Sequence, residues 1–162
     1  MKIKILLISI ITIIFFGCNK NIVYSNFINL GKSWSLNKRA TFQIDKSFFE
    51  DEKSYNLYIY IRNNNEYQYS NIFLIATIKD SLNIIEKDTL EYAMATSEGK
   101  WLGKGFSSLK ESKLLWKKNY RFPTINEIIF ELEQVIRRNG NQFPDKDLKG
   151  IVDIGLSIEI PY

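Results

Sequence analysis

Strict alternation of apolar and polar residues is the feature of this sequence that most restricts its fold. In the C-terminal segment, apolar residues occupy every second position: Val152, Ile154, Leu156, Ile158 and Ile160. Successive side chains of a β-strand point to opposite faces, so this pattern predicts a strand with one buried face. We therefore expect these five side chains to face the core.

Several other segments alternate in the same way. In the stretch Tyr55–Arg62, one face would carry Tyr55, Leu57, Ile59 and Ile61. The stretch Asn71–Lys79 has apolar residues on both faces, which is typical of a central strand. Further strands are expected at Ala40–Ile44, Asp88–Met94 and Lys113–Arg121. A chain with this many short alternating segments is expected to be mostly β-structure.

The segment Thr124–Arg138 fits two different structures. Its first four residues have the spacing of a helical capping box, and its apolar residues fit a helical stripe. The same residues also alternate, with Ile128, Phe130, Leu132 and Ile136 on one side. We favour a strand, because the neighbouring segments are strands whose edges need partners.

Asparagine and glycine, which tolerate positive φ, predict turns at Asn63–Asn65 and Asn139–Asn141. The predicted fold class is therefore all-β: an antiparallel β-sandwich, Greek-key or jelly-roll-like, with at most one short helix. Since the chain has a single cysteine, it can form no internal disulfide, and the fold must rest on its apolar core.

The N-terminus has the layout of a secretion signal. A basic start, Met1–Lys4, precedes an apolar run, Ile5–Phe16, and then the small residue Gly17. The run is about 12 residues, whereas a membrane-spanning helix needs ~20. We expect residues 1–17 to be removed, which lowers the formal net charge from +4 to +2 because Lys2 and Lys4 are lost.

Cys18, the only cysteine, directly follows Gly17, at the position where a lipoprotein carries its lipid. We predict a lipid anchor on Cys18, a tether over residues 18–26 and one domain over residues 27–162. The covalent lipid is the only added group that we expect, with no other cofactor. We expect the membrane as a partner through this lipid, in the outer membrane with the domain facing the periplasm.

The residue types present exclude several kinds of chemistry. The chain has no histidine, so serine–histidine catalysis and histidine metal ligands are absent. Its only thiol is expected to be acylated. Acidic residues could hydrolyse a glycoside in pairs, but no pattern in the sequence brings two of them together. Basic residues form no cluster denser than Lys117-Lys118 or Arg137-Arg138, so nucleic acid is not an expected partner. We predict no enzyme, no metal site and no small-molecule substrate.

Two bulky apolar residues stand out in a glycine-rich stretch, Gly99–Gly105. Trp101 and Leu102 lie between glycines in what must be a loop. They either hold the loop against the core or contact a partner protein, and we favour partner contact. The other two tryptophans, Trp34 and Trp116, are expected to fill the core, although aromatic residues could also form a sugar-binding platform.

Several stretches, in this order and spacing behind the lipoprotein signal, resemble the gliding-motility lipoprotein H (GldH) family over essentially the whole mature length. The matching stretches are Tyr55-Asn56-Leu57, Arg62-Asn63, Tyr67–Leu74, Asp88–Tyr92, Gly99–Gly105, Phe122-Pro123, Leu148–Ile151 and Asp153–Leu156.

The resemblance implies a cell-envelope lipoprotein needed for gliding, a process tied to a protein-secretion apparatus. It supplies no catalytic or ligand residues. Our first hypothesis is a non-enzymatic structural or adaptor component that contacts other gliding and secretion proteins of the envelope. The alternative is a module that binds polysaccharide or cell wall. An adaptor should expose an apolar patch, and a polysaccharide module should present stacked aromatic residues on a concave face.

Overall fold

The computed structural model describes residues 21–124, 127–138 and 140–161. Ten strands account for most of them: β1 (Ile22–Asn29), β2 (Ser33–Ser35), β3 (Ala40–Asp45), β4 (Tyr55–Asn63), β5 (Asn71–Lys79), β6 (Ile84–Ala93), β7 (Lys110–Tyr120), β8 (Glu127–Gln134), β9 (Asp147–Lys149) and β10 (Ile151–Glu159). Within the described ranges the only helix is a 3₁₀ turn, η1 (Lys46–Phe48), and no helix is long and apolar enough to span a membrane.

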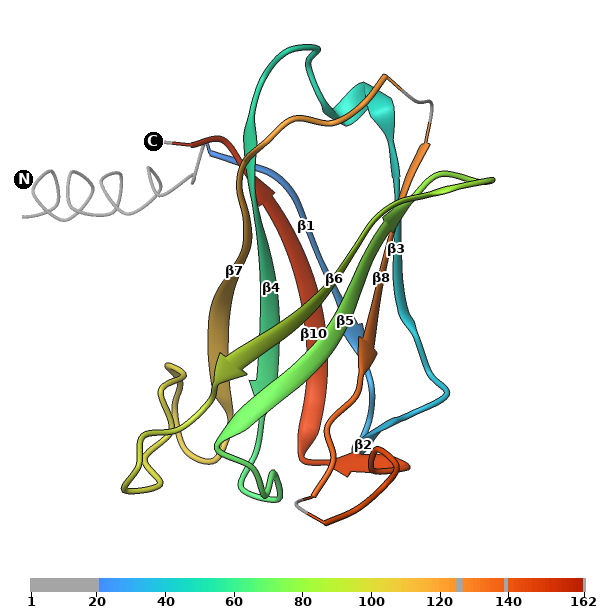
Figure 1. Cartoon of the computed structure of the whole chain (residues 1–162). Helices are drawn as coiled ribbons and strands as arrows, with labels where there is room; N and C mark the ends of the chain where they lie inside the picture. Colours follow the sequence, from blue (N-terminus) through green and yellow to red (C-terminus); the bar gives the residue numbers. More distant parts are fainter. Residues whose placement is uncertain (1–20, 125–126, 139, 162) are drawn as a thin grey trace, which may run out of the picture.

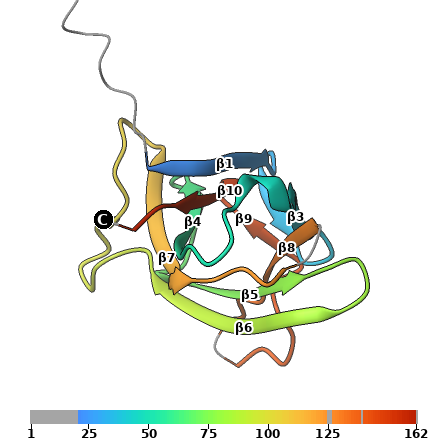
Figure 2. The ribbon, with the colours of Figure 1, turned by 90° about the horizontal axis from the view of Figure 1, so that it is seen from above.

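Eight of these strands form two antiparallel sheets that pack face to face. Their orders are β1-β10-β4-β7 and β3-β8-β5-β6, and the short strands β2 and β9 pair separately. Each connection between the eight strands crosses from one sheet to the other, except the β5–β6 hairpin (Figure 1). That order is the double Greek key of a jelly roll. Viewed along the strands, the two sheets enclose the core (Figure 2). The predicted antiparallel sandwich is confirmed.

The core consists of the inward faces of the two sheets. In β4 the predicted inward residues Tyr55, Leu57, Ile59 and Ile61 are all buried. β5 lies between β8 and β6, so its predicted central position is confirmed. Its inner face is fully buried, while residues such as Phe73 on its outer face are half-buried.

The inward face of β10 differs from the prediction at both ends. Ile154, Leu156 and Ile158 are fully buried, as expected. Val152 is only half-buried, because a β-bulge between Ile151 and Asp153 shifts the alternation and turns Ile151 into the core instead. Ile160 lies beyond the end of the strand and is exposed. The prediction was therefore wrong for Val152 and Ile160.

The ambiguous segment Thr124–Arg138 contains a strand. β8 is hydrogen-bonded to β3 on one side and to β5 on the other, and every second side chain is buried. Ile128, Phe130 and Leu132 point into the core, and Ile136 beyond the strand is also buried. The strand is favoured over a helix because β3 and β5 both need a hydrogen-bonding partner at this position. Residues 125 and 126 of the proposed capping box, and Asn139 of the second predicted turn, lie outside the described residues.

The first strand begins earlier than the predicted domain boundary. Residues 22–26, which we expected in the tether, belong to β1, which pairs with β10 along its length. Pairing with the last strand of the chain overrides the weak local pattern of this segment. Asn63, expected in a turn, is likewise the buried last residue of β4. The short strands β2 and β9 were not predicted.

The connections between strands gather at two opposite ends of the sandwich, the anchor end and the distal end. The anchor end holds the start of β1, the connections after β3, β5 and β7, and the end of β10. The distal end holds the connections after β1, β4, β6 and β8 (Figure 1).

Candidate functional site

The predicted site residues lie in different parts of the chain. Cys18 lies outside the described residues. Trp101 and Leu102 lie at the distal end, in a hairpin that follows β6. The hairpin is held by hydrogen bonds from the Leu102 amide to the Met94 carbonyl (2.9 Å) and from the Thr96 amide to the Lys100 carbonyl (2.8 Å). Gly99 takes a φ of +81° in its turn, a conformation that favours glycine.

The two bulky residues of this hairpin have different surroundings. Trp101 is half-buried and packs against the core, with its ring centroid 6.0 Å from that of Tyr67. Tyr67 is buried, and its hydroxyl donates a hydrogen bond to the Asn71 carbonyl (2.6 Å). Leu102, one residue on, is 53% exposed. Trp101 thus fastens the hairpin to the core, and Leu102 is left free to meet another molecule.

A short loop after Leu102 exposes further apolar side chains. Two backbone hydrogen bonds between Lys104 and Glu111 (2.8 and 2.7 Å) close the base of the loop. Within it, Phe106 is 95% exposed, and Leu109 is also exposed. We call Leu102, Phe106 and Leu109 the apolar loop cluster. The three side chains present apolar surface to solvent at the distal end.

A groove of about 530 Å³ runs beside Leu102, between the hairpin and the start of β7. Leu102, Leu114 and Ser112 are among its lining residues. Ser112 is only 6% exposed, and its hydroxyl has no hydrogen-bond partner among the described residues. Gly103 makes room for it, because a Cβ there would lie 2.9 Å from the Ser112 Oγ. The groove therefore has apolar and charged lining residues, and the Ser112 hydroxyl is buried behind its wall.

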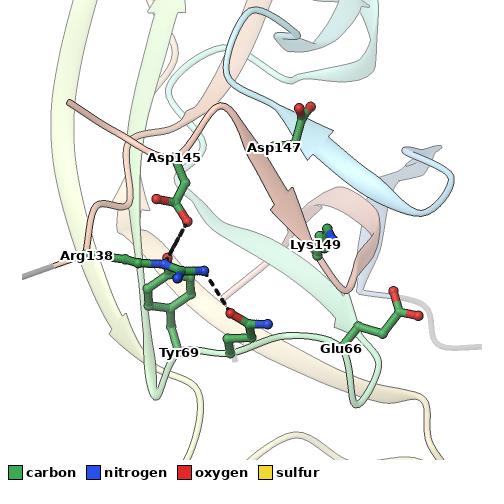
Figure 3. A pocket seen from close by; sticks show the side chains of 7 residues that line it. Glu66, Tyr69, Arg138, Asp145, Asp147 and Lys149 are labelled. Carbon is green, nitrogen blue, oxygen red and sulfur yellow. Dashed lines mark hydrogen bonds and ion pairs between the residues drawn. The ribbon is translucent and has the colours of Figure 1, made fainter. Parts of the chain in front are cut away.

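A second, smaller pocket of about 100 Å³ lies at the same end (Figure 3). Here Tyr69 donates a hydrogen bond to Asp145, and Arg138 donates to the Tyr69 hydroxyl (3.2 Å) and to the Gln68 side chain (2.9 Å). Burial, followed by the hydrogen bond to Asp145, raises the pKa of Tyr69. The phenol therefore stays protonated at neutral pH and acts as a donor. No sequence pattern predicts this cluster, because its members come from two separate connections, those after β4 and β8.

The arrangement of this pocket is that of a structural tie. Asp145 accepts from Tyr69, and the nearest oxygen–nitrogen distance to the Arg138 guanidinium is 3.7 Å. Lys149, Glu66 and Asp147 complete the lining. The carboxylate is thus engaged by neighbours from two connections, and no group of metal-binding residues occurs among the residues that the structure describes.

The aromatic residues that could serve a sugar platform are engaged elsewhere. Trp34 is fully buried and donates to the Lys38 carbonyl (2.7 Å), and Trp116 is buried and donates to Asp88 (2.9 Å). On the outer face of the β1-β10-β4-β7 sheet, the Lys113 ammonium lies 4.1 Å from the Tyr58 ring centroid. The Arg62 guanidinium lies 4.0 Å from that of Phe27. These cations cover ring faces on which a sugar would stack.

Comparison with known proteins points to one family. A model of the GldH lipoprotein family matches residues 22–158. The chain is 40% identical over 153 residues to a "Gliding motility lipoprotein GldH homolog" of Christiangramia forsetii, covering 94% of this chain and 93% of that protein. It is 35% identical over 147 residues to "Gliding motility lipoprotein GldH" of Flavobacterium johnsoniae, covering 91% and 90%.

One solved structure that aligns with most of the chain resembles it only weakly. Dimeric latent PorU of Porphyromonas gingivalis aligns with a TM-score of 0.37 at 10% identity, over 86% of this chain and 13% of that one. At this level the likeness carries no argument about function. The family match and the two relatives each cover most of the sequence, and the chain belongs to the GldH lipoprotein family of gliding-motility lipoproteins.

Proposed function

We propose that this gliding-motility lipoprotein is a non-enzymatic adaptor, which binds another envelope protein of the gliding machinery and its associated secretion apparatus through its distal end. The observation that carries the proposal is the apolar loop cluster. Leu102 is exposed on the hairpin after β6, and Phe106 and Leu109 are exposed on the next loop, whose base is closed by two hydrogen bonds. A preformed, exposed apolar surface suits a protein partner.

The proposal includes a membrane anchor. It places the lipid on Cys18 and the chain in the outer membrane, with the domain in the periplasm. The support is the sequence of the signal together with the family, whose members are named lipoproteins. An adaptor held in this way would present its distal end to other proteins of the envelope.

The adaptor role can be tested by removing the cluster without unfolding the domain. We expect the double variant Leu102→Ser, Phe106→Ser to fold normally, because both side chains are exposed. Cells that carry it in place of the wild-type chain should lose gliding, and in-cell crosslinks from the distal end to other envelope proteins should disappear.

The matched control is Leu115→Ser, an exposed leucine on the outer face of β7. It should keep both motility and crosslinks. Normal gliding by the double variant, at wild-type protein levels, would show that the apolar loop cluster is not the contact.

The orientation is tested separately with intact cells. External protease should leave the domain uncut if it faces the periplasm, and should digest it only after the outer membrane is permeabilised. Digestion in intact cells would place the domain on the cell surface instead.

A further inference from the structure

The anchor end exposes large apolar side chains of its own, at the opposite end of the sandwich from the apolar loop cluster. The exposed residues there are Ile22, Phe48, Leu82, Ile84 and Ile160. Ile22 pairs with Glu159, and Lys79 pairs with both Ile84 and Ile129, so the register places these residues at one end of both sheets.

Leu82 is presented by a rigid turn. The Asp80 carboxylate accepts hydrogen bonds from the amides of Leu82 (2.7 Å) and Asn83, and the Asp80 amide donates to the Asn83 carbonyl (3.0 Å). These bonds fix the tip of the β5–β6 hairpin, where Leu82 is 90% exposed. The turn therefore holds the leucine in solvent, where it has no folding role.

Phe48 is also exposed at the anchor end, where it lies beside β1. It ends the η1 turn and is 52% exposed, with its ring edge-on to Tyr24 of β1 at 6.3 Å between centroids. Four of the five charged residues in the same loop are paired: Lys46 with Asp51, and Lys53 with Glu50, both at 2.7 Å. Pairing reduces the cost of bringing these charges close to an apolar phase.

The distance from the lipidated residue to this end is short. The Ile160 amide donates to the Asn21 carbonyl (2.8 Å), so the sheet holds the chain from Asn21 onward. Two residues lie between Asn21 and Cys18, so the Cα atoms of the pair are three steps apart and at most about 11 Å from each other when the chain is fully extended. A lipid on Cys18 thus keeps the anchor end within reach of the bilayer surface, whereas the distal end lies a full strand length farther away (Figure 1).

We propose that the anchor end docks on the bilayer that holds the lipid, with Phe48 and Leu82 entering the boundary between headgroups and acyl chains. This inference rests on the lipid anchor of the proposed function. Contact with the bilayer removes the exposed apolar side chains from water, and it aligns the strands away from the membrane. The domain would then stand upright and display the apolar loop cluster toward the periplasm.

The test measures the depth of single positions in the full, lipidated chain. The chain has one cysteine, which the lipid occupies, so an introduced cysteine is the only free thiol. We would attach a fluorophore to Phe48→Cys, Leu82→Cys or Phe106→Cys, and reconstitute each protein in phosphatidylethanolamine–phosphatidylglycerol vesicles that contain nitroxide-labelled lipid. Phe106 is the matched control, because it is as exposed as Leu82 but lies at the distal end.

We expect the nitroxide lipid to quench the probes at positions 48 and 82 and to leave the probe at position 106 unchanged. In the double variant Phe48→Ser, Leu82→Ser, a probe at Ile84→Cys should lose part of its quenching, which excludes an effect of the fluorophore itself. Equal quenching at 82 and 106, or no quenching at 48 and 82, would overturn the docking.

Flotation of the same samples tests the lipid anchor on Cys18 separately from the docking of the anchor end. Protein that floats with the vesicles but shows no quenching at 48 and 82 retains its anchor and lacks only the docking. Protein that fails to float, and whose Cys18 reacts with the fluorophore, has no lipid, and both the anchor and the docking are then wrong.

Discussion

Single glycines at the distal end show how closely its backbones approach. Gly150, between β9 and β10, has a φ of +81°, and a Cβ there would lie 2.1 Å from the Tyr67 amide nitrogen. Its carbonyl accepts a hydrogen bond from the Asn64 amide (2.8 Å). Only a residue without a side chain fits this contact, so the β4–β5 connection is locked against the start of β10.

This contact predicts an unequal effect of two otherwise similar substitutions. Gly31 has the same φ as Gly150, but the space around it is open. Gly31→Ala should therefore lose only the conformational preference, about 1–2 kcal/mol. Gly150→Ala should cost clearly more, because the backbone of Tyr67 must move as well. Urea unfolding of both variants compares them directly, and equal losses would contradict the close approach.

Trp101 and Leu102 allow a second test at the scale of residues. Trp101→Ala removes a half-buried ring that packs on Tyr67, and should cost about 2–3 kcal/mol, below the ~3–5 kcal/mol of a fully buried aromatic. A loss of this size lowers the melting temperature by several degrees. Leu102→Ala should leave the melting temperature nearly unchanged, because its side chain is exposed.

Thermal unfolding followed by circular dichroism would measure both variants. From the sequence, we favoured partner contact for both Trp101 and Leu102. The geometry keeps that prediction for Leu102 and adds a stabilising role for Trp101. A Trp101→Ala protein as stable as wild type would restore the partner role to Trp101.

At the scale of elements, β10 is a central strand of the β1-β10-β4-β7 sheet. It lies between β1 and β4, and its inward side chains form the middle of the core. Two isoleucines near its end provide a matched pair. Ile158→Ala should cost about 2–5 kcal/mol, because the side chain is fully buried. Ile160→Ala should cost much less, since this residue lies past the strand and is 39% exposed. Similar losses, measured by denaturant unfolding, would contradict the strand boundary.

Between elements, one cluster joins the open edges of the two sheets. The Asp88 carboxylate of β6 accepts from Trp116 (2.9 Å) and pairs with Lys117 of β7 (2.9 Å). Burial opposes ionisation of Asp88, but the hydrogen bonds from Lys117 and Trp116 outweigh it and lower the pKa of Asp88. A carboxyl with a lowered pKa stabilises the fold above its unfolded pKa, and this contribution is lost as the pH falls through its folded pKa.

At the scale of the whole molecule, the anchor is tested by removing the thiol. Cys18→Ser should leave the chain without lipid, because the lipid is attached through a thioether bond that requires the cysteine sulfur. The protein should then leave the membrane fraction and appear in the soluble periplasmic extract. A Cys18→Ser protein that still sediments with membranes after a high-salt wash would show that another contact holds it there.

The class of fold and most of the strands follow from local sequence patterns. Alternation in β4 identified its buried face, because the period of two is a local property. The apolar residues on both faces of β5 predicted its central place, and the neighbouring strands favoured a strand for β8. The signal and Cys18 likewise need only local sequence to be recognised, as do the stretches that carry the family resemblance.

Features that depend on pairing between distant segments could be seen only in the folded chain. β1 has an irregular pattern and exists as a strand because β10 pairs with it, some 130 positions along the chain. The bulge in β10, which exchanges Ile151 for Val152 in the core, follows from its register with β4. Tyr69, Arg138 and Asp145 meet because two connections fold onto each other. Trp101 is half-buried and Leu102 exposed because Tyr67, from a distant connection, packs against Trp101. No local sequence pattern predicts that contact.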